Sequence, residues 1–184
     1  LNLFNAAVYF SRLTNKLFNT FYFTGLGKDH LSEMMIKRFK YENLKIDLIQ
    51  RIKGKYPGLY SIQTDKKGNR SFSYWRNESA AKEMIKNCNL DNLEKFIGNT
   101  ELFYYTGISL GILKPKDQNK LIELSKKSKL TAFDFNYRNS FHGNKIKSQS
   151  LFKKSNFFSK INFISLDDII EIFGKSDPFQ FINT

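Results

Sequence analysis

Two aromatic side chains and a cation stand together in the segment "SFSYWRNE", which contains Tyr74, Trp75 and Arg76. A further tyrosine, Tyr60, precedes them in "GLYSIQTD". An arginine can hold a carboxylate through two parallel hydrogen bonds, and tyrosine hydroxyls can bond sugar oxygens. These residue types are therefore suited to a ligand that carries both negative charge and hydroxyl groups. The alternative interpretation is a cross-strand aromatic pair with a solvated arginine beside it.

The elements that must position these side chains are two alternating strands, "GLYSIQTD" and "RSFSYWR". The four residues "KKGN" join them, and Gly68 and Asn69 can both adopt positive backbone angles, which predicts an antiparallel hairpin. Alternation places Phe72, Tyr74 and Arg76 on one face of the second strand. On the first strand it groups Tyr60, Ile62 and Thr64. A hairpin of this kind in an α/β protein is typical of a lid or an interface.

The rest of the chain alternates between helical and extended patterns. Apolar spacing predicts helices over residues 3–16, 30–43, 115–128 and 167–174, with Asp29 as an N-cap, Pro115 in a first turn and Gly174 as a terminator. Apolar runs predict strands over residues 17–27, 45–52, 101–109, 130–136 and 161–166. Strands that alternate with helices predict an α/β fold with a doubly wound, mainly parallel sheet.

Length and composition fit one globular domain over residues 1–184, with 41% hydrophobic residues. The one cysteine, Cys88, can form no internal disulfide, so we expect a cytoplasmic protein. No apolar run reaches the roughly 18 residues that a membrane span needs, and no export signal is recognisable.

The net charge of +13 raises the question of nucleic-acid binding. However, six of the 30 basic residues are arginine, and the lysines are spread from Lys16 to Lys175. This distribution favours a solvated surface. A basic nucleic-acid-binding module remains an alternative, and steep salt dependence of binding would support it.

Several long segments, taken together, resemble one family. "PGLYSIQTDKKGNRSFSYWRNESAAK", "YYTGISLGIL" and "FDFNYR" are similar to segments of the 2-keto-3-deoxygluconate kinases, a branch of the ribokinase-like, phosphofructokinase B type carbohydrate kinases. "NAAVYFSRL", "GLGKDHLSEMM" and "FISLDDIIEIFG" extend the resemblance over nearly the whole chain, in the order of the family. The resemblance implies a ribokinase-like fold that is incomplete at both ends, with a lid hairpin inserted at residues 56–76.

The resemblance also implies an activity and a site. The activity is phosphorylation of 2-keto-3-deoxygluconate to 2-keto-3-deoxy-6-phosphogluconate, with ATP and Mg²⁺ as cofactors. The implied substrate contacts are Asn5, Tyr60, Tyr74, Trp75, Arg76 and Arg138. The implied nucleotide and phosphate contacts are Asn136, Tyr137 and Arg138, which follow a predicted strand at the sheet edge where such folds bind ligands.

Asp168 approximates the acidic position of a family motif near the magnesium-water network, and Ser165 stands where relatives often have asparagine. An alternative is that Asp168 is a carboxylate stabilised by the N-terminal end of its own helix. Asn136 has a similar alternative, as a residue that caps a turn.

The family's Gly-Ala-Gly-Asp segment, whose aspartate is the general base, has no counterpart in these 184 residues. We therefore expect an N-terminal portion without the C-terminal half, with no catalytic base of its own and inactive by itself. The expected partners are a sugar acid and ATP, with no nucleic acid and no membrane, and a homo-oligomer is left open. Alternatives are a non-catalytic remnant, or a fructokinase or ribokinase, although an arginine in the lid favours an acidic sugar.

Overall fold

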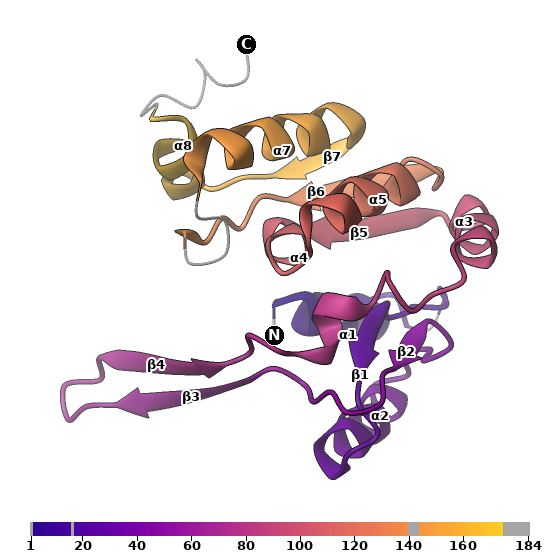
Figure 1. The fold of residues 1–184 in the computed structure, drawn as a ribbon, viewed down its shortest axis with the longest axis horizontal. Helices are drawn as coiled ribbons and strands as arrows, with labels where there is room; N and C mark the ends of the chain where they lie inside the picture. Colours follow the sequence, from indigo (N-terminus) through magenta and orange to yellow (C-terminus); the bar gives the residue numbers. More distant parts are fainter. Residues whose placement is uncertain (1, 16, 140–143, 175–184) are drawn as a thin grey trace. The chain divides into compact units, whose positions relative to one another are not determined.

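The computed structural model describes residues 2–15, 17–139 and 144–174. The chain divides into two compact units, residues 1–88 and residues 89–184, and each is described by itself. Figure 1 shows the helices and strands of both units. The expectation of a single domain over residues 1–184 stays a prediction.

The first unit combines helices with a short parallel strand pair and a long hairpin. Its elements in chain order are α1 (Asn2–Leu13), β1 (Thr24–Leu26), α2 (His30–Tyr41), β2 (Ile49–Arg51), β3 (Leu59–Thr64), β4 (Arg70–Trp75) and the 3₁₀ helix η1 (Ala80–Glu83). Strand β1 pairs in parallel with β2, and β3 pairs antiparallel with β4. The two predicted strands of the hairpin are therefore confirmed.

Apolar side chains from α1, α2 and the strand pair form the core of this unit. The buried members are Val8, Leu26, Ile36, Phe39, Leu44 and Ile49. The N-cap prediction for α2 is confirmed, because the Asp29 carboxylate accepts a hydrogen bond from the Ser32 amide at 3.1 Å.

Helices α1 and α2 are also joined by a buried carboxylate. Glu42, which is almost fully buried, accepts two hydrogen bonds from the Arg12 guanidinium at 2.8 and 2.9 Å. Arg38 approaches the same carboxylate at 2.6 Å. A buried carboxylate needs such partners, because burial without them is very unfavourable.

Several predicted strands are shorter than expected: residues 45–52 contribute only Ile49–Arg51, residues 101–109 only Leu102–Thr106, and residues 161–166 only Ile161–Phe163. The predicted strand over residues 17–27 is shortened most. The apolar run at residues 17–27 contributes only Thr24–Leu26 to a strand, and the side chains of Leu17 and Phe18 are exposed. An apolar run becomes a strand only where a neighbouring strand supplies backbone partners, and here β2 offers three residue pairs.

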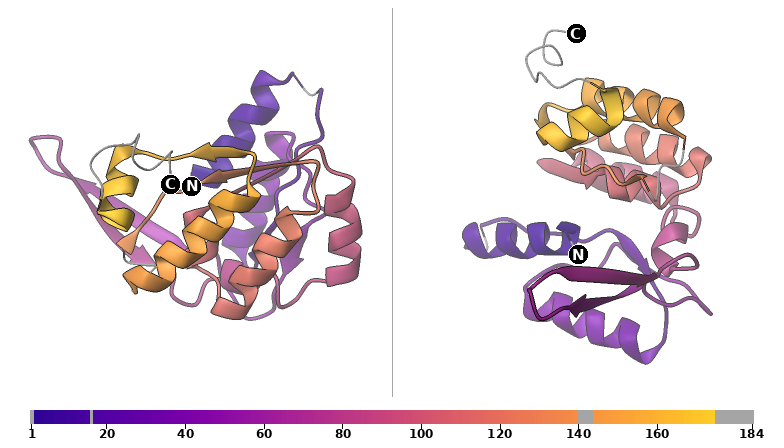
Figure 2. Two further views of the ribbon diagram at one scale, coloured as in Figure 1. Left: turned by 90° about the horizontal axis from the view of Figure 1, so that it is seen from above. Right: turned by 90° about the vertical axis from the view of Figure 1, so that its left-hand side faces the viewer.

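The second unit contains a parallel three-stranded sheet with the order β5-β6-β7. Its elements are α3 (Leu90–Gly98), β5 (Leu102–Thr106), α4 (Gly107–Gly111), α5 (Pro115–Ser125), β6 (Leu130–Asp134), α7 (Lys145–Phe158), β7 (Ile161–Phe163) and α8 (Leu166–Phe173). Helices α5 and α7 lie side by side on one face of the sheet (Figure 2). Three helices, α3, α4 and α7, are absent from the sequence-based prediction.

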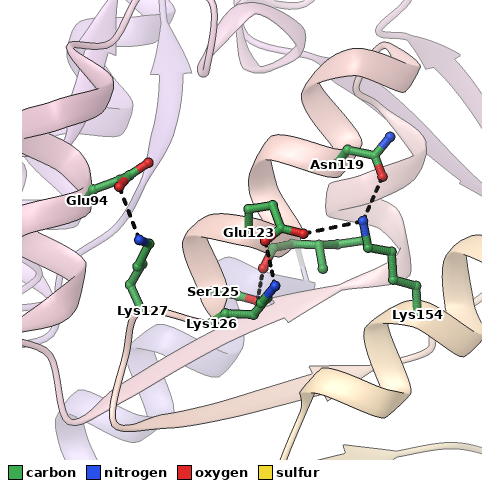
Figure 3. A network of polar contacts seen from close by, with 8 residues as sticks. Glu94, Asn119, Glu123, Ser125, Lys126, Lys127 and Lys154 are labelled. Carbon is green, nitrogen blue, oxygen red and sulfur yellow. Dashed lines mark hydrogen bonds and ion pairs between the residues drawn. The ribbon is translucent and has the colours of Figure 1, made fainter.

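Polar contacts at the surface link the helices of the second unit (Figure 3). Lys154 of α7 reaches Glu123 of α5 at 3.4 Å and the Asn119 side chain at 3.1 Å. Lys127 reaches Glu94 of α3 at 3.4 Å. Exposed ion pairs contribute little stability each, so packing of apolar side chains is the main source of stability for these helices.

The sequence-based fold class is confirmed: the structure is α/β, and both units contain parallel strand pairs. Within the described ranges, every helix is too short or too polar to span a bilayer.

Candidate functional site

The hairpin brings three of the predicted substrate contacts together. The β3–β4 register places Tyr60 opposite Tyr74 and Ile62 opposite Phe72. Side chains of opposed residues lie on the same face of a sheet, so these four form one surface, which we call the Tyr74 face. The predicted grouping by alternation is confirmed.

The Tyr74 face is open rather than part of a core. Its side chains remain 39% exposed at Tyr60 and 50% exposed at Tyr74. The rings of Phe72 and Tyr74 are stacked with centroids 6.1 Å apart, and the Tyr60 centroid lies 6.3 Å from that of Tyr74. The three rings therefore order one another, while the two tyrosines stay partly exposed.

Arg76 lies just past β4 and covers one of these rings. Its guanidinium carbon stands 3.9 Å from the centroid of the Tyr74 ring, which is a cation–π contact. Partial burial lowers the pKa of Arg76, but a guanidinium stays charged at neutral pH. The contact fixes a positive charge beside the two tyrosines.

Trp75 does not share this face. It is opposite Leu59 in the register and 63% exposed. Because successive side chains of a strand point to opposite faces, a ligand on the Tyr74 face would not meet the Trp75 ring. Asn5 lies on α1 with an exposed side chain.

The turn and the base of the hairpin are both held in place. At the turn, Gly68 has the predicted positive φ of 83°. Asn69, which could also adopt a positive φ, does not do so here; its amide donates to the Asp65 carboxylate at 2.9 Å. At the base, Lys55 pairs with Glu78 at 2.6 Å.

Two glycines in and after β1 allow the backbone on either side of the hairpin to approach β1 closely. A Cβ on Gly25 would stand 2.3 Å from the Ala80 carbonyl oxygen, and one on Gly27 would stand 1.9 Å from that of Lys55. The "GLG" segment therefore serves the close packing of backbone segments on either side of the hairpin.

The second group of predicted residues follows β6, at the carboxyl edge of the three-stranded sheet. Asn136 has a φ of 36°, in the left-handed region, and is buried. The Tyr137 ring is buried against Phe152, with centroids 5.8 Å apart. Arg138 has an exposed side chain whose guanidinium donates to the Tyr137 carbonyl at 2.6 Å. In this segment Arg138 is the side chain accessible to a phosphate.

Asp168 is joined to this segment by a hydrogen bond. Its carboxylate accepts from the Tyr137 amide at 2.8 Å. It also forms a capping box with Ser165, whose hydroxyl donates to it at 2.8 Å. The structure thus brings Asp168 together with residues 136–138, although they are far apart in the sequence.

Sequence reasoning missed two residues at this edge, Asp134 and Tyr104. Asp134 ends β6, and its carboxylate accepts a hydrogen bond from the Tyr104 hydroxyl of β5 at 3.0 Å. Burial raises the pKa of the Asp134 carboxyl; the Tyr104 hydrogen bond opposes the rise, the charge of Asp168 adds to it, and Arg138 opposes it. The available signal was a carboxylate at the end of a strand, two residues before Asn136.

The raised pKa of Asp134 predicts a pH-dependent stability. A carboxyl whose pKa is higher in the folded state than its unfolded value of about 4 contributes stability at low pH. That contribution is lost as the pH rises through the folded pKa. Asp134→Asn cannot ionise, so the Tm of the variant relative to wild type should increase from pH 4 to pH 8.

Calorimetry across that pH range would test this expectation, with Asp47→Asn as the control for removal of an exposed carboxylate. A difference in Tm between Asp134→Asn and wild type that stays constant with pH would contradict it.

The described residues contain no group of three or more His, Cys, Asp or Glu side chains that could hold a metal ion. They therefore do not form a metal site from protein ligands alone. Mg²⁺ is commonly held by one or two carboxylates together with substrate phosphates. We assign no reaction step to a metal held by these residues.

A curated protein with a known name is similar in sequence to this chain. The chain is 34% identical over 176 residues to the 2-dehydro-3-deoxygluconokinase of Escherichia coli (strain K12), covering 93% of this chain and 57% of that protein. It thus spans little more than half the length of this curated relative.

Solved structures show the same fold. A PfkB protein from Polaromonas sp. JS666 matches with a TM-score of 0.80 at 15% identity, over 95% of this chain and 58% of that one. An uncharacterized sugar kinase from Pyrococcus horikoshii, solved in complex with ATP, matches with a TM-score of 0.75 at 21% identity, over 92% of this chain and 54% of that one.

The family comparison covers nearly the whole chain, including the hairpin and the segment after β6. The sequence profile of the pfkB family carbohydrate kinases matches residues 4–175. By this match and by its fold, the chain belongs to the pfkB family of carbohydrate kinases.

Proposed function

We propose that this chain is part of a kinase that transfers the γ-phosphoryl group of ATP, with Mg²⁺, to 2-keto-3-deoxygluconate. The similarity to the E. coli enzyme supports this substrate class. The observation that carries the proposal is the Tyr74 face, where Arg76 lies over the Tyr74 ring beside a second tyrosine.

The charge on this face favours an acidic sugar over a neutral one. The Arg76 guanidinium can hold a carboxylate bidentately, and the hydroxyls of Tyr60 and Tyr74 can bond the hydroxyls of the same ligand. A neutral sugar offers the guanidinium no anionic partner. In this proposal the hairpin acts as a lid that selects the acid.

The segment after β6 would act on the phosphate. Arg138 is the accessible cation there, and it would contact the substrate or the transferred phosphoryl group. Phosphoryl transfer is catalysed mainly by positioning and charge neutralisation, which an arginine at the carboxyl edge of the sheet can supply. Asn136 and Tyr137 would fix the backbone from which Arg138 extends.

The proposal also retains the finer sequence-based predictions. These are a cytoplasmic location, no nucleic-acid or membrane partner, and an open possibility of a homo-oligomer. The assignments of Asn5 and Trp75 to the substrate site stay predictions.

A direct assay tests the proposed substrate. The protein at its full natural length, supplied with ATP and Mg²⁺, should phosphorylate 2-keto-3-deoxygluconate with a kcat/KM at least about tenfold above those for fructose and ribose. One lost charge-assisted hydrogen bond is worth about that factor. Equal or faster turnover of either neutral sugar would overturn the assignment of an acidic substrate.

A further inference from the structure

We propose that Asp168 is a positioning residue, which holds residues 136–138 in place and affects phosphoryl transfer only through Arg138. This differs from a role in a magnesium-water network and from a role confined to its own helix. The catalytic part of the inference rests on the proposed function, and the structural part does not.

Hydrogen bonds from the protein occupy most of the acceptor positions of the Asp168 carboxylate. The carboxylate accepts the Tyr137 amide at 2.8 Å on one oxygen. The other oxygen accepts the Ser165 hydroxyl at 2.8 Å and the Ser165 amide at 3.2 Å. A carboxylate has about four acceptor positions, and three of them are filled here. The residue is 8% exposed, which leaves little surface for a ligand.

Helix α8, which carries Asp168, is held in place by packing. Ile169 and Ile172 of α8 are buried, and the Gln149 side chain of α7 donates to the Ile172 carbonyl at 2.7 Å. Phe173 at the end of α8 contacts Phe135 with centroids 6.5 Å apart. The helix is therefore packed against α7 and against the segment that leaves β6.

The segment that Asp168 contacts contains a residue in an uncommon backbone conformation. The left-handed angle at Asn136 is one that asparagine tolerates better than most residues with a side chain, but it is still less favourable than the helical or extended regions. The Tyr137 amide is the next hydrogen-bonding group along the chain, and its bond to a carboxylate is charge-assisted. The same bond fixes the backbone that precedes Arg138.

Two substitutions distinguish this role from that of a charged ligand. Asp168→Asn keeps a carbonyl oxygen that can still accept the Tyr137 amide, while it removes the negative charge. Asp168→Ala removes the acceptor as well. Positioning predicts that the asparagine variant retains function and the alanine variant loses it, whereas a contact to a metal or its waters needs the charge and predicts similar losses for both.

The first measurement is amide hydrogen exchange at Tyr137, followed by NMR without any substrate. Exchange should become about tenfold faster or more in Asp168→Ala, as expected for a lost charge-assisted bond. It should change little in the control Ser165→Ala, which keeps the Tyr137 contact. The amide of Phe133 within β6 reports whether the sheet stays intact. Unchanged exchange at Tyr137 in an intact Asp168→Ala variant would overturn the inference.

The second measurement is kinetic and uses the protein at its full natural length. We expect kcat/KM to fall about tenfold in Asp168→Ala, and within about threefold in Asp168→Asn. In an Arg138→Ala background, Asp168→Ala should cause no further fall, because it acts through the same side chain. Additive losses, or equal losses in the two Asp168 variants, would refute the positioning role. If no sugar acid is phosphorylated, the proposed function fails, and the exchange result still decides whether Asp168 holds the segment.

Discussion

Gly107→Ala is expected to lower the free energy of unfolding by about 3 kcal/mol, at the upper end of the range for overpacked sites. A Cβ at this position would lie 2.0 Å from the Phe135 carbonyl oxygen and 2.5 Å from the Phe152 ring. The carbonyl belongs to the segment that leaves β6, and Phe152 is fully buried, so neither neighbour can move aside easily.

Thermal unfolding would measure this effect, with an expected fall in Tm of about 6–12 °C for a chain of this size. Gly98→Ala is the matched control in the same unit. A Cβ there would meet only the Lys127 carbonyl oxygen, at 4.0 Å, and alanine favours a helix more than glycine does. Similar Tm values for the two variants would show that the backbone around Gly107 can relax and that the close approach is not required.

Arg76→Ala is expected to reduce kcat/KM for 2-keto-3-deoxygluconate by about 30-fold to 1,000-fold, which corresponds to about 2–4 kcal/mol. The expected loss is large because the guanidinium would hold the substrate carboxylate in a closed site. Since the arginine also lies over Tyr74, part of the effect could come from disorder of that ring. Controls must therefore separate loss of charge from loss of packing.

Arg70→Ala provides the first control, because Arg70 begins β4 at the turn end of the hairpin and alternation places it on the Tyr74 face. It should leave kcat/KM within about twofold, as is usual for an exposed charge. Tyr74→Phe keeps the ring beneath Arg76 and removes one hydroxyl, so we expect a loss of only about 0.5–1.5 kcal/mol.

The decisive comparison uses a neutral analogue that lacks the carboxylate. Arg76→Ala should reduce kcat/KM for the acid far more than for the analogue, because only the acid loses an ionic partner. Equal reductions for both sugars would mean that Arg76 stabilises the hairpin and does not recognise the substrate.

Local patterns in the sequence were sufficient for the hairpin and for several helix ends. Alternation alone predicted that Phe72 and Tyr74 share a face of the second strand and that Tyr60 and Ile62 share a face of the first, because successive side chains of any strand point in opposite directions. The register between the strands then put both pairs on one face. The caps at Asp29 and Gly174 were also predictable, since an N-cap or a left-handed C-terminal residue acts within a few residues of its helix.

Local patterns did not predict an element correctly where its periodicity was weak or where a strand lacked a neighbouring strand to pair with. Helix α7, "KIKSQSLFKKSNFF", has no continuous apolar stripe, so its periodicity did not indicate a helix. Helix α4 has five residues and depends on the Thr106–Ser109 capping box. The apolar run at residues 17–27 looked like a full strand, yet only the part beside β2 became one.

The residue types of the site, the hairpin that carries Tyr60, Tyr74 and Arg76, and the α/β class were all predictable from local sequence patterns. Which distant side chains meet at the carboxyl edge of the sheet was not predictable in this way. Tyr104 reaches Asp134 across 30 positions of the sequence, and Asp168 reaches the Tyr137 amide across 31. Such pairs depend on the register between parallel strands and on how the following helix packs. The strand register and the helix packing are not encoded in the periodicity of a single segment, because both arise when separate segments bury their apolar faces together.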